Sequence, residues 1–232
     1  MDTLMLTHEP IRLGPTPRTL TGAATAIDAR LLDGPLGRAG AVAVVDDIVD
    51  ATTVAALACE ALTTGTEAER QCGATHAVDA RRGDVAGRAL GSGGGGPVQD
   101  TLYRSPQLLA RLGALCGATV QPTGGRGSYS YYTRPGDHLD LHVDVPRCDV
   151  TLITVLQDST PTDDPGGALA VWADHIGASL DEIRSTGAPP TATIKVPQGS
   201  SVVLLGGLLP HAVLPLGTTG TRVISPLCFA AS

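Results

Sequence analysis

The sequence predicts a mainly β protein in which helices pack against an antiparallel β-sandwich or jelly roll. From about residue 119 onward, short runs of β-branched and apolar residues alternate with turn residues. The 29 Gly and 17 Pro make up about a fifth of the 232 residues, which argues against a helical bundle. We expect one domain, with helices and loops from residues 1–118 supporting a β core at 119–232. The expected strands of the core are 119–122, 128–134, 141–145, 150–157, 168–172, 191–196, 201–205, 211–214 and 221–229.

The first half of the chain contains one predicted strand and two predicted helices. The run Ala-Val-Ala-Val-Val at 41–45 has strand character. Asp50 is placed to N-cap a helix that continues to Leu62 with apolar residues at helical spacing. Ser105, followed by Pro106, predicts the start of a second helix, and Gly117 predicts its end.

Other segments are expected to be irregular. Residues 1–40 have weak periodicity and are predicted to wrap the surface or to form a short leading strand. The glycine run 91–97 is interpreted as a mobile loop, because the Lys-Ser/Thr pair of a phosphate-binding loop does not follow it. The segments 63–104 and 158–190 are long enough to act either as lids or as connectors, and the capping box at Ser179 predicts a short helix in the second.

Composition limits the partners and the compartment. The formal net charge of −7 excludes the broad basic surface expected of a nucleic-acid-binding protein. The N-terminus has no signal-peptide pattern, and the longest apolar stretch, 202–209, is shorter than the roughly 20 residues of a membrane span. Five scattered cysteines without a CxxC pair indicate neither a disulfide framework nor a zinc site. We therefore expect a soluble, cytoplasmic protein with reduced thiols, in an oligomeric state that the sequence does not indicate.

The residues with the clearest chemical implication are two histidines and an aspartate. Side chains at i and i+2 of a strand face the same side, so His142 and Asp144 are both predicted to point into the mouth of the β core. His211, on a later strand, supplies a third ligand. Two His and one carboxylate leave open metal positions, an arrangement associated with non-haem Fe(II) oxygenases. The other histidines, His8, His76, His138 and His175, are interpreted as ordinary core or surface residues.

Arg222 follows His211 by about one strand, a turn and the start of another strand. Burying a guanidinium is costly without an anion, and its forked donors match a carboxylate in two places at once. A dicarboxylate is therefore the partner that Arg222 predicts.

Residues 128–229 resemble the Fe(II)/2-oxoglutarate-dependent dioxygenases, nearest to their prolyl-hydroxylase-like branch. The resemblance begins in the run Tyr132-Thr-Arg-Pro-Gly-Asp-His-Leu-Asp-Leu-His-Val-Asp144. It continues in the paired glycines Gly166-Gly167 before an apolar strand, in Pro210-His211 and in Arg222. Somewhat under half of the chain is covered, and the ordered combination is more specific than any single motif.

The resemblance implies a double-stranded β-helix with defined ligand roles. His142, Asp144 and His211 would bind Fe(II), and Arg222 would pair with the distal carboxylate of the co-substrate 2-oxoglutarate, with O₂ as the other co-substrate. Tyr132 would hydrogen-bond 2-oxoglutarate, or Tyr131 if the register slips by one residue.

Two positions depart from the family pattern. Ile224 stands where many relatives have Ser two residues after the arginine, and Ser225 lies on the opposite face of the strand. Val155 stands where prolyl-hydroxylase-like enzymes have a tyrosine that helps to hold the distal carboxylate. Thr151, on the same strand face as Val155, is the candidate replacement, while a water or another residue remains an alternative.

The resemblance implies hydroxylation of an unactivated C–H bond in a small molecule, with release of succinate and CO₂. An amino acid, a small peptide or a natural-product intermediate is the expected substrate class, and desaturation or cyclisation stay open as outcomes. Because Asp144 is present, halogenation is not expected, since related halogenases have Gly or Ala there. Trp172 is interpreted as core packing in preference to a substrate platform. Candidates for gripping an anionic group are Arg81, Arg82, Arg126 and Arg134.

Two other hypotheses remain. A cupin-like metal-binding or sensor protein without oxygenase activity would keep the three metal ligands but would not need a buried Arg222. A β-sandwich whose histidines are coincidental would bind no metal.

Overall fold

The computed structural model describes residues 26–74, 86–125, 127–145 and 147–232 of the chain. The helices of these residues are α1 (Ala26–Asp33), α2 (Pro35–Arg38), α3 (Ala51–Gly65), α4 (Pro97–Tyr103), α5 (Pro106–Cys116) and α6 (Leu180–Thr186). The strands are β1 (Val42–Val45), β2 (Glu69–Ala74), β3 (Gly87–Gly93), β4 (Val120–Pro122), β5 (Tyr129–Tyr132), β6 (His138–His142), β7 (Val150–Asp158), β8 (Leu169–Val171), β9 (Ala192–Ile194), β10 (Ser201–Leu204), β11 (His211–Val213) and β12 (Arg222–Ala231).

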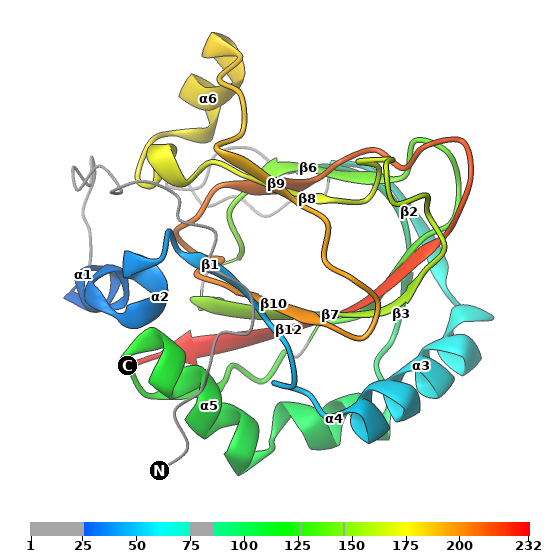
Figure 1. The fold of residues 1–232 in the computed structure, drawn as a ribbon, viewed down its shortest axis with the longest axis horizontal. Helices are drawn as coiled ribbons and strands as arrows, with labels where there is room; N and C mark the ends of the chain where they lie inside the picture. Colours follow the sequence, from blue (N-terminus) through cyan, green and yellow to red (C-terminus); the bar gives the residue numbers. More distant parts are fainter. Residues whose placement is uncertain (1–25, 75–85, 126, 146) are drawn as a thin grey trace.

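The strands form one antiparallel sheet that curls into two facing layers. The larger layer has the order β1-β10-β7-β12-β5, and the smaller has the order β6-β11-β8-β9. Strand β3 connects the layers at one side because it pairs with both β5 and β6, and β2 pairs with β3 beyond them. Figure 1 shows the two layers lying over one another with α6 outside the smaller layer. This is a double-stranded β-helix, so the predicted fold class is confirmed.

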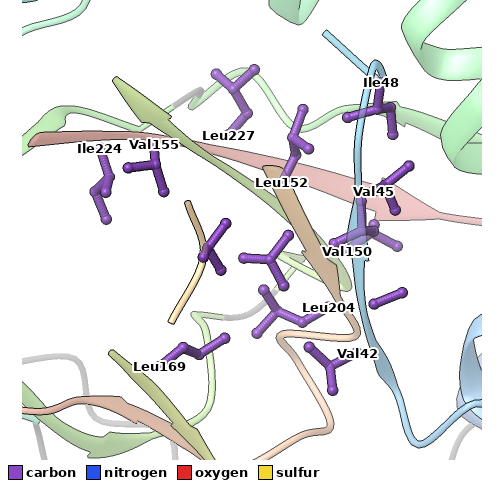
Figure 2. Packing of buried hydrophobic residues seen from close by; sticks show 14 of the residues in the cluster. Val42, Val45, Ile48, Val150, Leu152, Val155, Leu169, Leu204, Ile224 and Leu227 are labelled. Carbon is purple, nitrogen blue, oxygen red and sulfur yellow. The ribbon is translucent and has the colours of Figure 1, made fainter. Parts of the chain in front are cut away.

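The interior between the layers is apolar at the end formed by β1, β7 and β10. Val42 pairs with Leu204 across β1 and β10, and both side chains are fully buried. Val155 and Ile224 are register partners on β7 and β12, and both belong to the same core cluster. Figure 2 shows these side chains directed into the space between the strands. Burial of this set is the main stabilising contribution to the two-layer arrangement.

Helices α3, α4 and α5 cover the outer face of the larger layer (Figure 1). One carboxylate links them to the sheet: Glu60 of α3 accepts hydrogen bonds from the Tyr129 hydroxyl at 2.6 Å and from the N–H groups of Val98 and Gln99 at 2.7 and 3.0 Å. Burial raises the pKa of Glu60, but these hydrogen bonds outweigh it and the pKa is lowered overall. An ionised Glu60 thereby ties α3, the start of α4 and β5 together.

The predicted helix starts are confirmed by their caps. Asp50 accepts a hydrogen bond from the Thr53 N–H at 2.9 Å at the start of α3, and Ser105 caps α5 in the same way. Gly117 ends α5 in the left-handed conformation, with φ of 69°. Ser179 caps α6 through the N–H of Glu182 at 3.0 Å. Each of the predicted strands in 119–232 corresponds to one strand from β4 to β12, although β6 begins three residues earlier than expected.

The interpretation of 91–97 as a mobile loop is wrong at both ends, because residues 91–93 belong to β3 and Pro97 begins α4. Gly91 and Gly93 belong to β3 and pair with Tyr131 and Tyr129 of β5. A Cβ atom at Gly93 would lie 3.0 Å from the Tyr131 ring, and one at Gly91 would lie 3.2 Å from Tyr131 Cβ. These glycines therefore let the Tyr131 side chain pack across β3, which a pattern search for loops does not detect.

The prediction of reduced thiols is wrong for two of the five cysteines. Cys148 and Cys228 form a disulfide although they are 80 residues apart in the chain. The pairing of β7 with β12 places Cys228 opposite Thr151, three residues after Cys148. Cys59, Cys72 and Cys116 are free, and burial raises the pKa of the Cys116 thiol to about 12. None of the helices described is both long and apolar enough to cross a membrane.

Candidate metal centre

The two histidines of the predicted metal site lie side by side on neighbouring strands of the smaller layer. His142 ends β6, His211 begins β11, and the two are register partners. Their ring centroids are 4.2 Å apart. Asp144 Oδ1 lies 3.6 Å from His142 Nε2 and 3.8 Å from His211 Nε2. One potential ligand atom from each residue lies within 4.8 Å of the others, in the only such cluster of three found in the described part of the chain.

Backbone carbonyl groups fix the orientation of both imidazoles. His142 Nδ1 is 2.7 Å from the Asp140 carbonyl oxygen, and His211 Nδ1 is 2.8 Å from the Leu209 carbonyl oxygen. A carbonyl oxygen only accepts, so in each neutral ring Nδ1 carries the hydrogen and Nε2 keeps a lone pair. Burial lowers the pKa of His211 to about 4, so this ring is neutral at pH 7. Both Nε2 atoms lie on the side of Asp144, where the lone pair of a neutral imidazole would point.

Asp144 is held differently from the expectation of a continuous strand through 141–145. Strand β6 ends at His142, and the Asp144 N–H instead donates to the Gly206 carbonyl oxygen at 2.8 Å. The Thr151 hydroxyl donates to Asp144 Oδ2. Burial raises the pKa of Asp144, but the two imidazoles and the Thr151 hydroxyl lower it well below its usual range overall. The site thus presents one carboxylate and two imidazoles, a ligand set that fits a divalent transition metal.

Gly206 is a residue of this centre that the sequence analysis missed. A Cβ atom at this position would overlap Asp144 Oδ2 and crowd Thr151 Oγ1. Any side chain here would therefore displace the carboxylate from the two histidines. The only signal in the sequence is the pair Gly206-Gly207 directly after an apolar strand, which is too common to assign.

The position of Thr151 does not fit its predicted role beside Arg222. Thr151 lies near the start of β7, opposite Cys228, whereas Arg222 lies opposite Asp158 at the other end of β7. The two side chains therefore cannot hold the same carboxylate. Thr151 contacts Asp144 instead, and its hydroxyl is also 3.3 Å from Cys148 Sγ. We correct its role to that of a positioning residue for Asp144.

Thr151→Val is expected to weaken metal binding about 10-fold while leaving the fold intact. Valine has nearly the shape of threonine but cannot donate to Asp144, and loss of one outer hydrogen bond to a metal ligand typically costs 10–100-fold in affinity. Titration of the purified variant with Mn(II), followed by calorimetry, measures this. Thr154→Val on the same strand is the control, because the Thr154 hydroxyl contacts Ser201 instead. Equal Mn(II) affinity in the Thr151 variant and the wild type would contradict the assigned role.

Arg222 lies in the interior with an internal carboxylate that the sequence did not indicate. Arg222 is 4% exposed. Its Nη1 contacts the Asp158 carboxylate, and its Nη2 donates to the Val196 carbonyl oxygen at 3.1 Å. Gly167 has a φ of 74°, and a Cβ there would lie 2.9 Å from Arg222 Cδ. Glycine is therefore required at position 167 for two reasons: the backbone is left-handed there, and a side chain would collide with that of Arg222.

Tyr132, and not Tyr131, shares the interior with Arg222. Tyr132 is the register partner of Arg222 and is 1% exposed, and its hydroxyl makes no hydrogen bond within the described residues. Burial raises its pKa well above the ordinary value, although the charges of Arg222 and Arg88 act in the opposite direction. Tyr131 faces α3, where its hydroxyl donates to the Ala61 carbonyl oxygen at 2.7 Å. Of these two tyrosines, Tyr132 is the one that lies in the interior beside Arg222.

Trp172 lies in a second apolar cluster with Leu180 and Ile183 of α6. Its Nε1 donates to the Ala188 carbonyl oxygen at 2.8 Å. This cluster lies between α6 and the smaller layer, so the contacts agree with packing and not with a substrate platform.

The remaining candidates are not part of the cluster. His138 contacts the Gly136 carbonyl oxygen and Asp140, and His175 ends a short 3₁₀ turn. Arg134 is exposed in the turn before β6, and Ser225 accepts a hydrogen bond from Gln99 on the outer side of the larger layer. The predictions for His8, His76, Arg81, Arg82 and Arg126 fall outside the described residues.

No family model matches this sequence, and no curated protein matches it. Solved structures do match its fold. A prolyl-4-hydroxylase from Pseudomonas putida is similar with a TM-score of 0.54 and 22% identity, over 88% of this chain and 98% of that chain. An oxidoreductase of the 2OG-Fe(II) oxygenase family from Burkholderia pseudomallei has a TM-score of 0.56 and 14% identity, over 90% and 92%. The non-heme alpha-ketoglutarate-dependent epimerase SnoN from nogalamycin biosynthesis has a TM-score of 0.59 and 14% identity, over 87% and 82%. At these identities the likeness shows a shared fold.

Proposed function

We propose that this protein is an Fe(II)- and 2-oxoglutarate-dependent oxygenase that hydroxylates an unactivated C–H bond of a small molecule and releases succinate and CO₂. The observation that carries the proposal is the convergence of His142, Asp144 and His211 in an interior that also contains the buried Arg222. Similarity in fold to oxygenases with these co-substrates supports it. The substrate class is proposed to be an amino acid, a small peptide or a natural-product intermediate.

His142, Asp144 and His211 would hold the iron through two imidazole nitrogens and one carboxylate oxygen. The bound iron would supply the activation of O₂ at the expense of 2-oxoglutarate. The chain itself contributes two imidazoles oriented by backbone carbonyl groups and a carboxylate whose pKa is lowered by its neighbours, so the three ligands are pre-arranged for a cation. Their fixed positions direct where the C–H bond of a substrate must lie.

Arg222 and Tyr132 would bind the distal carboxylate of 2-oxoglutarate. The Asp158 carboxylate contacts Nη1 of Arg222, and the Val196 carbonyl oxygen accepts a hydrogen bond from Nη2. The guanidinium has five N–H donors, so further donors remain for an incoming carboxylate. The co-substrate would thus share Arg222 with Asp158 or displace it. Val155 and Ile224 would offer apolar surface to the methylene groups of 2-oxoglutarate. They stand at the positions where the resembling enzymes have a tyrosine and a serine.

The metal-binding protein without oxygenase activity remains the second candidate, and one observation favours it. Asp158 gives the buried Arg222 a charge partner within the chain, so the arginine does not by itself demand a dicarboxylate ligand. Both candidates share the three metal ligands, and they differ in whether 2-oxoglutarate binds.

Calorimetry with 2-oxoglutarate in the presence and absence of Mn(II) distinguishes the two. The oxygenase is expected to bind 2-oxoglutarate only when metal is present. With Fe(II) and O₂ it is expected to form succinate and CO₂ slowly even without its primary substrate. Binding of Mn(II) without any binding of 2-oxoglutarate would favour the sensor. Equilibrium dialysis showing no uptake of Fe(II) or Mn(II) would contradict both. The single-domain organisation over 1–232 and the cytoplasmic location stay predictions.

A further inference from the structure

Arg88 is a cation of the interior that the proposed roles do not use. It lies on β3, and its Nε is the one buried side-chain nitrogen or oxygen without a hydrogen-bond partner among the residues described. Its Nη1 donates to Gln71 Oε1 on β2 at 3.2 Å. Within the described part of the chain no carboxylate pairs with it. A buried donor without an acceptor is costly, so the arrangement is suited to an anion that arrives from outside.

Register places Arg88 on the interior face of the sheet, on the strand next to β6, which carries the metal ligand His142. Arg88 pairs with Leu139 of β6, which packs against the main hydrophobic core. Leu90 lies two residues further along β3, on the same face as Arg88, and is buried in that core. The charge of Arg88 acts on the buried Tyr132 hydroxyl. The neighbouring Gly87 lies so close to Asp140 that a Cβ there would overlap its carboxylate. Asp140 in turn holds His142 through its carbonyl oxygen.

The free part of the guanidinium is the edge that binds a carboxylate in two places. Gln71 occupies Nη1, and the side formed by Nε and Nη2 has no partner in the described residues. Two parallel N–H donors on one edge match the two oxygens of a carboxylate. Gln71 thus fixes the rotation of the group while leaving this edge for a ligand.

Arg88 and Arg222 differ in depth, which separates their roles. Arg222 is almost completely buried, so a co-substrate that shares it with Asp158 or displaces Asp158 is held deep in the interior. Arg88 is only partly buried, on a strand flanked by β2 at the border of the sheet, so a molecule from solvent reaches it first. The two cations therefore provide separate positions for two acids.

We propose that Arg88 binds a carboxylate of the primary substrate, which makes the substrate a small carboxylic acid. This rests on the proposed function of the same site. The carboxylate would anchor the substrate at the border of the barrel, with its reacting carbon toward the metal ligands.

The test compares free amino acids with their carboxamides as substrates and compares two variants with the wild type. The wild type is expected to release succinate above the uncoupled rate with acids and not with the matching carboxamides. Arg88→Gln is expected to raise the KM for the best acid at least 10-fold and to leave the KM for 2-oxoglutarate unchanged. Arg88→Lys, which keeps the charge but loses the two-donor edge, is expected to give an intermediate KM. Arg104→Gln removes an exposed charge at the end of α4, outside the larger layer, and is expected to behave as wild type.

Three results would overturn the inference. They are equal use of acids and carboxamides by the wild type, an unchanged KM for the acid in Arg88→Gln, and a rise confined to the KM for 2-oxoglutarate. If the wild type itself released no succinate, that result would contradict the proposed function instead. In that case calorimetry of the Mn(II)-loaded wild type and Arg88→Gln with the same acids still decides whether Arg88 holds a carboxylate. If Arg88→Gln does not fold, as judged by thermal unfolding, the same comparison is made with Arg88→Lys.

Discussion

Asp144→Ala is expected to weaken metal binding strongly and to abolish the formation of succinate from 2-oxoglutarate. The change removes the carboxylate oxygen that, among the described residues, lies near both His142 Nε2 and His211 Nε2, and it leaves two imidazoles as the protein ligands. Loss of an outer contact to a ligand already costs 10–100-fold, so loss of the ligand itself should weaken Mn(II) binding by more than about 100-fold. Calorimetry measures the affinity, and succinate release measures the activity.

Asp140→Ala is the matched control for this variant. Asp140 is exposed, and it contacts His142 through its backbone carbonyl, which the substitution keeps. We expect this control to bind Mn(II) as the wild type does. Activity that survived in Asp144→Ala would remove the basis for assigning the metal centre, whatever the fold.

The metal ligands could be predicted because short sequence motifs, in a fixed order along the chain, contain them. His142 and Asp144 are two residues apart, and His211 opens a strand whose apolar pattern is readable on its own. Even there the local geometry differed, because Asp144 lies beyond the end of β6 and depends on Gly206 and Thr151 for its position. The sequence predicts which side chains meet more readily than it predicts what holds them.

The partners that were missed all depend on strand register. Asp158 meets Arg222, and Cys228 meets Cys148, only because β12 pairs with β7 in one particular alignment. Arg88 faces the interior because β3 lies between β5 and β6, an order that no pattern within 86–93 reveals. A shift of one residue in either pairing would turn these side chains to the other face. Long-range register is therefore the information that separated the predicted site from the observed one.

The difference in depth between the two arginines also has consequences for charge. Arg222 with Asp158 forms a buried pair, and such a pair is strongly destabilised when only one partner is removed. Arg88 has no such partner in the described residues, so its replacement should cost the fold little. Loss of function at Arg88 is thus easier to separate from loss of stability than loss of function at Arg222.

Arg222→Gln is expected to abolish the binding of 2-oxoglutarate and also to destabilise the protein. The substitution leaves the Asp158 carboxylate buried without its cation, which typically costs about 3–5 kcal/mol, so the single variant confuses two effects. The double variant Arg222→Gln/Asp158→Asn removes both charges and should recover most of the free energy of unfolding measured with urea. Its affinity for 2-oxoglutarate should nevertheless remain at least ~30-fold weaker, about 2 kcal/mol, because the charged partner of the distal carboxylate is gone.

Asp158→Asn alone separates a positioning role of the aspartate from a competing one. This variant keeps Arg222 and removes the internal carboxylate that contacts Nη1, so calorimetry with Mn(II) should show 2-oxoglutarate bound at least as tightly as in the wild type. Weaker binding would mean that Asp158 orients Arg222 for the co-substrate instead of competing with it. A double variant that bound 2-oxoglutarate as tightly as the wild type would be the more serious result. The buried arginine would then serve only its ion pair, and the metal-binding protein without oxygenase activity would become the better account of this barrel.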